Sequence, residues 1–285
     1  RSGGAGSGLH VTYDGGKSWK QLSTNNGLPE GELGRIGLAF APGNPEVVYA
    51  VVEAKHSVMM RSDDRGETWK VVSNRGGLRS IARRPFYFAK LVVDPVNENR
   101  VYNLAGVLDR SEDGGQNFDV RLGSGRIHGD HHALWVSPDG QILINGNDAG
   151  VSLSRDRGAS WRFIENLPLG QFYKVNVDLA TPFNVMGGIQ DNNMWHGPSS
   201  VWHNGGIRSS DWDQVGAGDG FATLAVPGNP RYVYSTREAG FISLSDLETG
   251  ERKTIRPAHP DAKLRFIWNP LMAIDPHDEA LYFAS

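Results

Sequence analysis

The chain has 285 residues, of which 39% are hydrophobic and 21% charged, a composition ordinary for a globular protein that buries a core. Its 29 Lys and Arg against 32 Asp and Glu give a formal net charge of −3, so a nucleic-acid partner has little electrostatic support. No apolar run approaches the ~18 residues that a membrane-spanning helix needs, and the absence of Cys excludes a disulfide scaffold and thiolate zinc sites.

A turn signature recurs four times in the first part of the chain. It reads Ser or Thr, then Asp two positions later, Gly two positions after that, and an aromatic residue three positions further on. Its members are Asp14 with Trp19, Asp64 with Trp69, Asp113 with Phe118, and Asp156 with Trp161. The steps between these aspartates are 50, 49 and 43 residues. A period of about 40–50 residues is typical of the four-stranded blades of a β-propeller.

Each member of the signature has a structural explanation. An Asp in a tight turn accepts hydrogen bonds from backbone N–H groups just ahead of it, and the Gly permits a positive φ. We therefore expect Asp14, Asp64, Asp113 and Asp156 to hold hairpins and to touch no substrate. The following Trp19, Trp69 and Trp161 are expected to pack as wedges between blades.

A second repeat lies out of phase with the first and consists of two apolar strands joined by a Pro, Asn, Asp or Gly turn, as in residues 38–49 and 91–102. Six such inner hairpins predict an all-β fold, a single β-propeller over residues 1–285 with six visible blades. Full blades are expected near 33–73, 87–121, 130–165, 171–215 and 218–256, and a composite blade from 8–22 with 265–285. The first and last residues suggest a piece of a longer protein.

The topology of a blade predicts where a site would form. The start of each innermost strand and the end of the second strand emerge on one face, around the mouth of the channel, and Glu53 and Asp109 are expected at second-strand ends there. The ligand-binding candidates on this rim are Arg35, Tyr87, His131, Asn147, Asp148, Tyr173, Gln190, Asn192, Arg237, Glu238 and Arg265. Asp130, Asp191 and Asp219 are the catalytic candidates. The alternative is that these groups bind water and one another along the channel.

The metal and cofactor signals are weak. His128, Asp130, His131 and His132 suit a divalent ion, but alternate residues of a strand face opposite ways, which favours a structural hydrogen-bonding role. The Asx-rich turn of Asn145, Asn147 and Asp148 leaves a structural Ca²⁺ open, without the ligand spacing of a defined loop. No cofactor is predicted. Residues 216–220 are Gly-rich but precede no helix, which excludes a phosphate cradle.

The repeated turns resemble the Asp-box, or bacterial neuraminidase repeat, of sialidases, sortilin-type receptors and xyloglucan-active endoglucanases. Residues 128–135, 187–193 and 218–221 resemble a group of exported bacterial sortilin-like propellers, often labelled glycosyl hydrolases. This resemblance covers nearly the whole chain. It implies a periplasmic, cell-surface or secreted location and seven or more blades, or two propellers in tandem.

Three hypotheses for function follow. The first is a noncatalytic module that binds a glycan or a partner protein on the channel face, since there is no G-x-S-x-G and no HExxH motif. The second is a glycoside hydrolase with Asp191 as acid and Asp219 as base. A sialidase would need an Arg cluster, for which Arg35, Arg237 and Arg265 are the nearest candidates. The third is a subunit of a larger extracytoplasmic assembly. Exposed Trp195 and Trp202 would suit sugar rings or proline-rich peptides.

Overall fold

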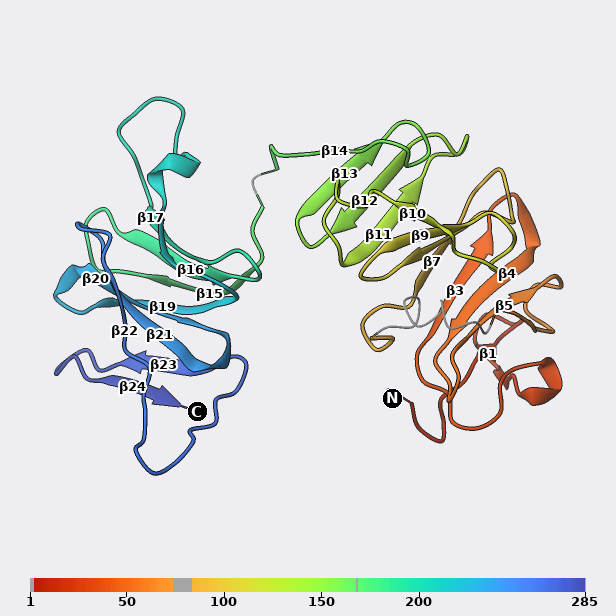
Figure 1. Cartoon of the computed structure of the whole chain (residues 1–285), viewed down its shortest axis with the longest axis horizontal. Coiled ribbons are helices and arrows are strands. Elements are labelled where there is room, and N and C mark those ends of the chain that lie inside the picture. Colours follow the sequence, from red (N-terminus) through yellow and green to blue (C-terminus); the bar gives the residue numbers. More distant parts are fainter. Residues whose placement is uncertain (1–2, 74–83, 168, 285) are drawn as a thin grey trace. The chain divides into compact units, whose positions relative to one another are not determined.

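A computed structural model describes residues 3–73, 84–167 and 169–284 of the chain. It divides into two compact units, unit 1 (Arg1–Leu167) and unit 2 (Pro168–Ser285). Both consist of antiparallel strands (Figure 1). The helical elements of the described residues are three single 3-10 turns, η1 (Thr24–Asn26), η2 (Ser209–Asp211) and η3 (Glu238–Gly240). None of the helices in these ranges is long and apolar enough to cross a membrane.

In its described residues, unit 1 contains three four-stranded sheets and one two-stranded sheet, and each sheet follows the chain order of its strands. The two-stranded sheet is β1 (His10–Val11) and β2 (Lys20–Gln21). The four-stranded sheets are β3 (Ile36–Ala41), β4 (Asn44–Val52), β5 (Val58–Ser62) and β6 (Lys70–Ser73); β7 (Lys90–Val93), β8 (Val101–Leu104), β9 (Leu108–Ser111) and β10 (Val120–Leu122); and β11 (His131–Val136), β12 (Leu143–Asn147), β13 (Gly150–Ser154) and β14 (Arg162–Phe163).

Within residues 169–284, unit 2 contains two four-stranded sheets and one two-stranded sheet. The four-stranded sheets are β15 (Phe172–Val177), β16 (Asn184–Ile189), β17 (Met194–Pro198) and β18 (Asp213–Gly216), then β19 (Gly220–Val226), β20 (Asn229–Arg237), β21 (Phe241–Asp246) and β22 (Arg252–Thr254). The two-stranded sheet is β23 (Leu271–Ile274) and β24 (Leu281–Ala284).

The first strands of neighbouring sheets lie side by side within each unit. In unit 1, β7 contacts both β3 and β11, and in unit 2, β19 contacts both β15 and β23. The sheets therefore radiate from their first strands, which is the arrangement of propeller blades. The chain is an all-β protein with a β-propeller fold, as its sequence predicts, and the part that the structure describes forms five complete four-stranded blades. The composite blade and the single propeller over 1–285 stay predictions, and residues 1–2, 74–83, 168 and 285 lie outside the described ranges.

The core lies between the faces of adjacent blades. In unit 1, Tyr49 and Met59 of one blade are fully buried against Leu91 and Val101 of the next. Tyr102, Leu108 and Leu143 form the equivalent layer one blade further, and Met186 and Val233 meet in unit 2. Each large apolar side chain buried in this way contributes about 1.5–3 kcal/mol to folding.

The Asp of each repeated turn joins the third and fourth strands through several hydrogen bonds. Asp64 accepts from the backbone N–H of Thr68 at 2.9 Å and from the hydroxyls of Ser62 and Thr68. Asp14, Asp113 and Asp156 repeat this pattern. These donors stabilise the carboxylate, so the hydrogen bonds from Thr68 lower the pKa of Asp64 to about 2.

The aromatic residues that follow these turns differ in burial. Trp69 is 7% exposed and donates its indole N–H to Gly66, and Trp161 donates to Gly158 in the same way. Trp19 is 62% exposed, so the prediction that it forms a buried wedge is wrong. It precedes β2, and the two short strands of the β1–β2 sheet are too small to cover an indole.

Two other positions differ from the sequence expectation. Asp109 was expected at the end of a second strand, but that strand, β8, ends at Leu104 and Asp109 lies on the third strand, β9. Arg265 was expected at the start of an innermost strand, but β23 begins at Leu271 and Arg265 is an exposed residue of the preceding loop. For both residues, the sequence prediction extended a strand through a neighbouring turn or loop, because the apolar pattern of the sequence continues there.

Candidate functional site

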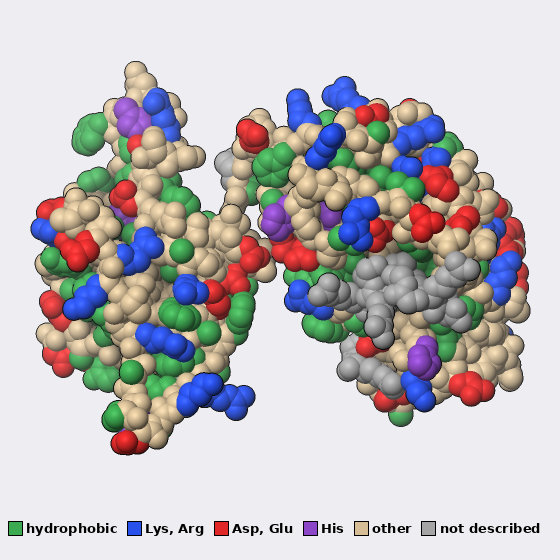
Figure 2. All heavy atoms as spheres, in the orientation of Figure 1, with side chains coloured by type: hydrophobic (Ala, Val, Ile, Leu, Met, Phe, Trp, Pro, Cys, Tyr) green, Lys and Arg blue, Asp and Glu red, His purple; other side chains and the backbone are tan. Residues whose placement is uncertain are grey.

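The site residues predicted from the sequence fall into two groups because the chain forms two units. Unit 1 holds Arg35, Tyr87, Asp130, His131, Asn147 and Asp148, and unit 2 holds Tyr173, Gln190, Asp191, Asn192, Asp219, Arg237, Glu238 and Arg265. We call the described segments that carry the first group the unit 1 rim. The described segments that carry the second group, except Arg265, are the unit 2 rim. Acidic and basic side chains are interspersed over the visible face of both units (Figure 2).

A β-bulge lies at the start of three innermost strands. The register with the second strand shifts between His131 and Ala133, between Phe172 and Lys174, and between Gly220 and Thr223. A bulge turns the side chains of its strand relative to the ladder and is frequent beside functional sites. At these three positions of the rims, the blades depart from regular strand geometry.

Buried hydrogen bonds link His131, Asn145 and Asn147 in the unit 1 rim. His131 is 3% exposed and its Nδ1 lies 2.9 Å from Asn145 Oδ1, which also accepts from Asn147 Nδ2 at 3.0 Å. Burial lowers the pKa of His131, because the apolar surroundings disfavour the imidazolium. A neutral histidine that bonds a buried amide fits the structural role that the strand alternation favours.

Other residues of the unit 1 rim are also bonded to neighbours. Arg35 donates from its guanidinium to the carbonyl of Phe86 at 2.6 Å, and His132 Nε2 lies 2.7 Å from Asp148 Oδ1. Tyr87 packs its ring edge against His132 at 5.4 Å between centroids. Asp130 has a left-handed φ of 54° next to the bulge. Most of these side chains thus bind the protein itself.

The unit 2 rim is a relay of hydrogen bonds across three connections. The carboxylate of Asp219 accepts from the backbone N–H of Asp191 at 2.7 Å. The backbone N–H of Asp219 in turn donates to Glu238 at 3.0 Å, and Glu238 pairs with Arg237 at 2.6 Å. The turn between β16 and β17, the link from β18 to β19, and the end of β20 are therefore fixed to one another.

Asn193 joins two of these connections, the β16–β17 turn and the β18–β19 link, through two further hydrogen bonds. Its backbone N–H donates to the carbonyl of Gly218 at 3.0 Å, and its side-chain oxygen accepts from the N–H of Gly218 at 3.1 Å. Two neighbouring blades also approach each other closely at glycines. A Cβ added at Gly188 would lie 2.0 Å from the backbone of Gly220. This close approach explains why both segments are rich in glycine.

The backbone of the unit 2 rim is strained at three non-glycine residues. Asp191, Asn193 and Ala239 have φ values of 55°, 72° and 57°, in the left-handed region. Such conformations cost of order 1 kcal/mol or more each and persist where the surroundings enforce them, often at binding sites. The relay of hydrogen bonds supplies that enforcement here.

Polar and aromatic side chains are exposed beside this relay. Asp191 and Asn192 are exposed, and Phe172 and Tyr173 at the start of β15 are 39% and 37% exposed. The Tyr173 ring packs on Phe221 of the next blade at 4.6 Å, and the N–H of Gln190 bonds the carbonyl of Gln171, which places the amide-bearing turn beside the aromatic pair. This combination of amides, carboxylate and aromatic faces suits recognition of a polar ligand.

The two tryptophans singled out in the sequence have different environments. Trp195 donates its indole N–H to the carbonyl of Asn192 at 2.7 Å and so fastens the rim turn. Trp202 is fully exposed in the loop between β17 and β18. Only the first of them belongs to the unit 2 rim.

The described residues contain no group of three or more His, Cys, Asp or Glu placed to hold a metal ion. The oxygens considered for Ca²⁺ are engaged by protein groups, since Asn147 Oδ1 accepts from the N–H of Ala149 and Asp148 pairs with His132. The structural Ca²⁺ stays a hypothesis without a ligand set of its own.

Sequence reasoning missed Asn193 and the Gly188–Gly220 contact. Asn193 lies in the stretch 187–193 that carries the family resemblance, but nothing in the sequence marks it as the residue that joins two connections. The signal that would have found it is an Asn in a turn facing a Gly-rich link, since Asn tolerates the left-handed region and bonds nearby backbone groups.

Comparison with known proteins gives only distant likenesses. No protein-family model matches the chain, and no curated protein matches it. Among solved structures, an ancestral GH74 enzyme shares 17% identity over 87% of this chain and 38% of its own, with a TM-score of 0.42. YCF48 bound to D1 peptide shares 13% over 85% of this chain and 73% of its own, with a TM-score of 0.38.

The GH74 xyloglucanase from Xanthomonas campestris shares 16% identity over 87% of this chain and 43% of its own, with a TM-score of 0.34. The chain therefore spans less than half the length of either GH74 protein. At such low identities and TM-scores these likenesses say nothing about activity, and the propeller assignment rests on the blades of the chain itself.

Proposed function

We propose that this chain is a recognition or scaffold module that binds a glycan or a partner protein on the unit 2 rim, with a glycan as the first candidate. The observation that carries the proposal is the relay from Asp191 through Asp219 to Glu238, which holds an exposed polar turn in a strained conformation. Fixing a surface in advance lowers the entropy cost of binding.

The position of Asp219 favours binding over hydrolysis. Its carboxylate already accepts the N–H of Asp191 and so maintains the turn. A general base must instead reach a water molecule beside the sugar, and a glycosidase needs a second carboxyl group across the bond that is cleaved. Asp219 acts in this proposal as a positioning residue, and Gln190, Asn192 and Tyr173 contact the ligand.

A sugar fits the exposed groups better than a purely apolar ligand does. Amide and carboxylate groups hydrogen-bond hydroxyls, while Phe172 and Tyr173 offer partly exposed ring faces for the apolar faces of a pyranose. The repeated turns resemble the Asp-box of sialidases and sortilin-type receptors, which supports an extracytoplasmic module. A larger assembly in which the propeller is a subunit is compatible with the same rim.

The second candidate is a glycoside hydrolase. It is favoured by one observation, that Asp191 and Asp219 lie in contact in the folded chain although they are 28 positions apart. In this reading Asp191 is the acid and Asp219 the base, and Asp130 belongs to unit 1. The carboxylates would then be needed for their charge and not only for their hydrogen-bond geometry.

The test is reducing-end release and binding measured together on a β-glucan, a xylan and a mannan. Asp219→Asn keeps an oxygen that can accept the N–H of Asp191, whereas Asp219→Ala removes it. The proposal expects binding without release, binding retained in Asp219→Asn within about threefold, and a loss of roughly tenfold in Asp219→Ala.

Release that disappears in both Asp191→Asn and Asp219→Asn would establish the hydrolase instead. Absence of both binding and release across the panel would exclude the glycan and turn attention to protein partners. Size-exclusion chromatography of native material then tests the assembly, since a strictly monomeric species would count against it.

A further inference from the structure

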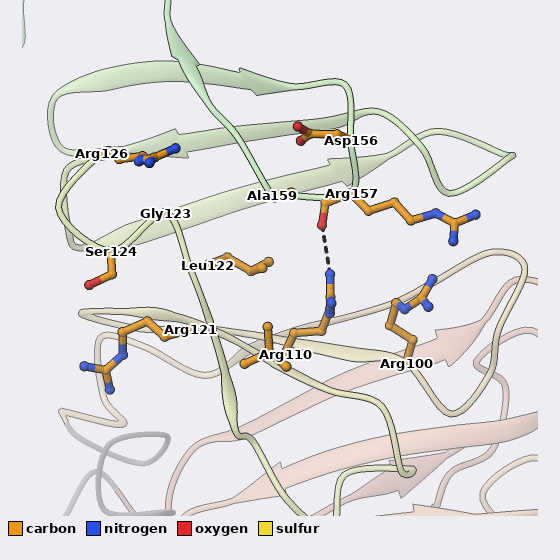
Figure 3. Close-up of a pocket in the computed structure, with 12 residues that line it drawn as sticks. Arg100, Arg110, Arg121, Leu122, Gly123, Ser124, Arg126, Asp156, Arg157 and Ala159 are labelled. Atoms are coloured by element: carbon orange, nitrogen blue, oxygen red, sulfur yellow. Dashed lines mark hydrogen bonds between the residues drawn. The ribbon is translucent and has the colours of Figure 1, made fainter.

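A groove in unit 1 runs along the outer strand β10 and reaches His131 of the unit 1 rim at one end. Its larger part is a cavity of about 530 Å³ lined by Val120–Ser124 and by the turn of Asp156–Ala159, together with Arg100, Arg110 and Arg126 (Figure 3). A second cavity of about 210 Å³ shares the stretch from Arg121 to Ser124 and extends to His131. The two cavities are therefore parts of one groove that follows β10 and the turn after it.

Arginine is the dominant residue of the groove. Five of them line the larger cavity, namely Arg100, Arg110, Arg121, Arg126 and Arg157. On a chain with a formal net charge of −3, such a concentration of guanidinium groups is a local exception. Arginine offers a planar fork of donors that matches carboxylate geometry.

Three of these arginines are already paired. Arg100 contacts Asp94 and Glu112, and Arg121 lies 3.3 Å from Asp109. Arg110 Nε lies 2.7 Å from Glu112, as an ion pair without a hydrogen bond. These pairs fix the wall of the groove and leave several N–H donors of each guanidinium uncommitted.

The other two arginines carry the available charge. Neither Arg126 nor Arg157 forms a salt bridge within the part of the chain that the structure describes, and Arg126 is exposed. The guanidinium of Arg157 donates to the side-chain amide oxygen of Gln141 at 2.6 Å, a neutral partner that leaves its positive charge in place. The one carboxylate among the lining residues, Asp156, is bound to Ser160 and Ser154 in its turn. Five arginines and one carboxylate stand among the residues that line the larger cavity, so the lining itself is basic.

The wall of the groove is held across two blades. The guanidinium of Arg110, from β9, reaches over the cavity and donates to the carbonyl of Arg157 at 2.8 Å (Figure 3). Arg100 and Arg110 have side chains only 14% and 17% exposed. Arg157 itself sits at a left-handed φ of 57° in the turn that Asp156 fixes. The charges are thus positioned before any ligand arrives.

The backbone of β10 is the second feature of the groove. This strand is the outer edge of its sheet, in the order β10–β9–β8–β7, and its three residues and the next two line the cavity in succession. An edge strand presents N–H and C=O groups that have no partner within the sheet, and an extended peptide can pair with them. A polysaccharide has no backbone of this kind.

We propose that this groove binds an extended acidic peptide segment of a partner protein. The peptide lies along β10 as an added strand, and its carboxylates pair with Arg126 and Arg157. This site is separate from the proposed glycan site in residues and in chemistry, so that either stands if the other fails.

The experiment measures binding of a six-residue polyglutamate peptide to the whole chain by fluorescence anisotropy, with the matching polyglutamine peptide as a control for charge. We expect the acidic peptide alone to bind, and its affinity to fall with added salt because the pairs lie near the surface. Arg126→Gln and Arg157→Asn should each weaken binding roughly tenfold, since a charge-assisted hydrogen bond is lost.

The matched control is Arg65→Asn. Arg65 follows Asp64 as Arg157 follows Asp156, has a φ of 60°, and is not among the lining residues. Both substitutions place Asn, which tolerates the left-handed region, and both remove one positive charge. Equal effects of Arg65→Asn and Arg157→Asn, or no binding of the acidic peptide, would overturn the proposal.

Strand addition has its own test. Methylation of alternate backbone nitrogens of the polyglutamate peptide keeps every carboxylate and removes the N–H groups that pair with β10. We expect this peptide to lose binding, and retained binding would overturn the added strand. Binding of polygalacturonate in place of the peptide would overturn the peptide in favour of an acidic polysaccharide.

Discussion

In unit 1 the polar residues at the start of β11 and the end of β12 are buried and bond to one another, through His131, Asn145 and Asn147. In unit 2 the equivalent place, around Asp191 and Asp219, uses hydrogen bonds to hold the backbone and leaves side chains in solvent. In the sequence, both segments are rich in polar residues and are predicted to lie around the mouth of the channel. The same topological position is thus buried and bonded to itself in one blade and exposed in another, where we propose that it binds a ligand.

The largest expected effect tests the close contact under the unit 2 rim. Gly188→Ala places a Cβ 2.0 Å from the backbone carbon of Gly220, where nothing flexible can give way. We expect the free energy of unfolding to fall by about 3 kcal/mol. Urea denaturation measures it, and Gly6→Ala, where a Cβ meets nothing within 4 Å, is the control. Equal stability of the two variants would refute the contact.

The next effect should separate the two rims by stability. His131→Ala removes a buried ring and leaves Asn145 without one of its hydrogen bonds, which should cost about 2 kcal/mol. His132→Ala is the neighbouring control, because its ring is 38% exposed, and should cost less than about 1 kcal/mol. Denaturant unfolding compares them. A loss of glycan binding in His131→Ala would assign recognition to unit 1 instead.

The reverse pattern is expected at the unit 2 rim. Asn192→Ala removes an exposed amide and should leave the free energy of unfolding within about 0.5 kcal/mol of the parent chain. Affinity for the bound polysaccharide should fall roughly tenfold, since hydrogen bonds to the sugar are lost. Asn229→Ala, at the opposite end of β20 from Arg237, is the matched control. Isothermal titration calorimetry measures both affinities, and an unchanged affinity in Asn192→Ala would show that Asn192 does not belong to the site.

The smallest effect concerns the Asp turns of unit 1. Hydrogen bonds from Ser18, Thr68 and Ser160 lower the folded-state pKa values of Asp14, Asp64 and Asp156 to about 2. Since these values lie below that of the unfolded chain, about 3.9, the turns stabilise the fold above that pH. The contribution should disappear as the pH falls from about 4 to about 2.

Urea unfolding at a series of pH values between 5 and 2 measures this dependence. Asp64→Asn cannot titrate, so its unfolding free energy should vary less steeply in this window than that of the parent chain. Identical pH profiles of parent and variant would show that the hydrogen bonds of Asp64 do not stabilise its charged form.

Much of the fold follows from the sequence because the turn chemistry repeats. Asp64 and its three counterparts fix a period, and the strands lie on either side of them in the structure as the blade length requires. Predictions of where single residues lie were less accurate. Arg265 and Asp109 were misplaced because strand ends depend on turn geometry, and Trp19 is exposed because only a two-stranded sheet is near it.

The candidate sites were only partly accessible to sequence reasoning. Asp191 and Asp219 could be brought together by blade topology, but the direction of their hydrogen bond, from backbone N–H to carboxylate, depends on the left-handed turn. The arginine groove was not visible at all, since its residues come from separate strands and turns of two blades. These arginines come together only when the two blades pack against each other.

The most direct test of the account is amide hydrogen exchange of the whole chain with and without the β-glucan, the xylan and the mannan. We expect at least one of them to slow exchange at residues 190–193, 217–219 and 237–239, and to leave residues 131–148 unchanged. Slower exchange confined to 131–148, or no change with any of the three, would contradict glycan recognition by the unit 2 rim.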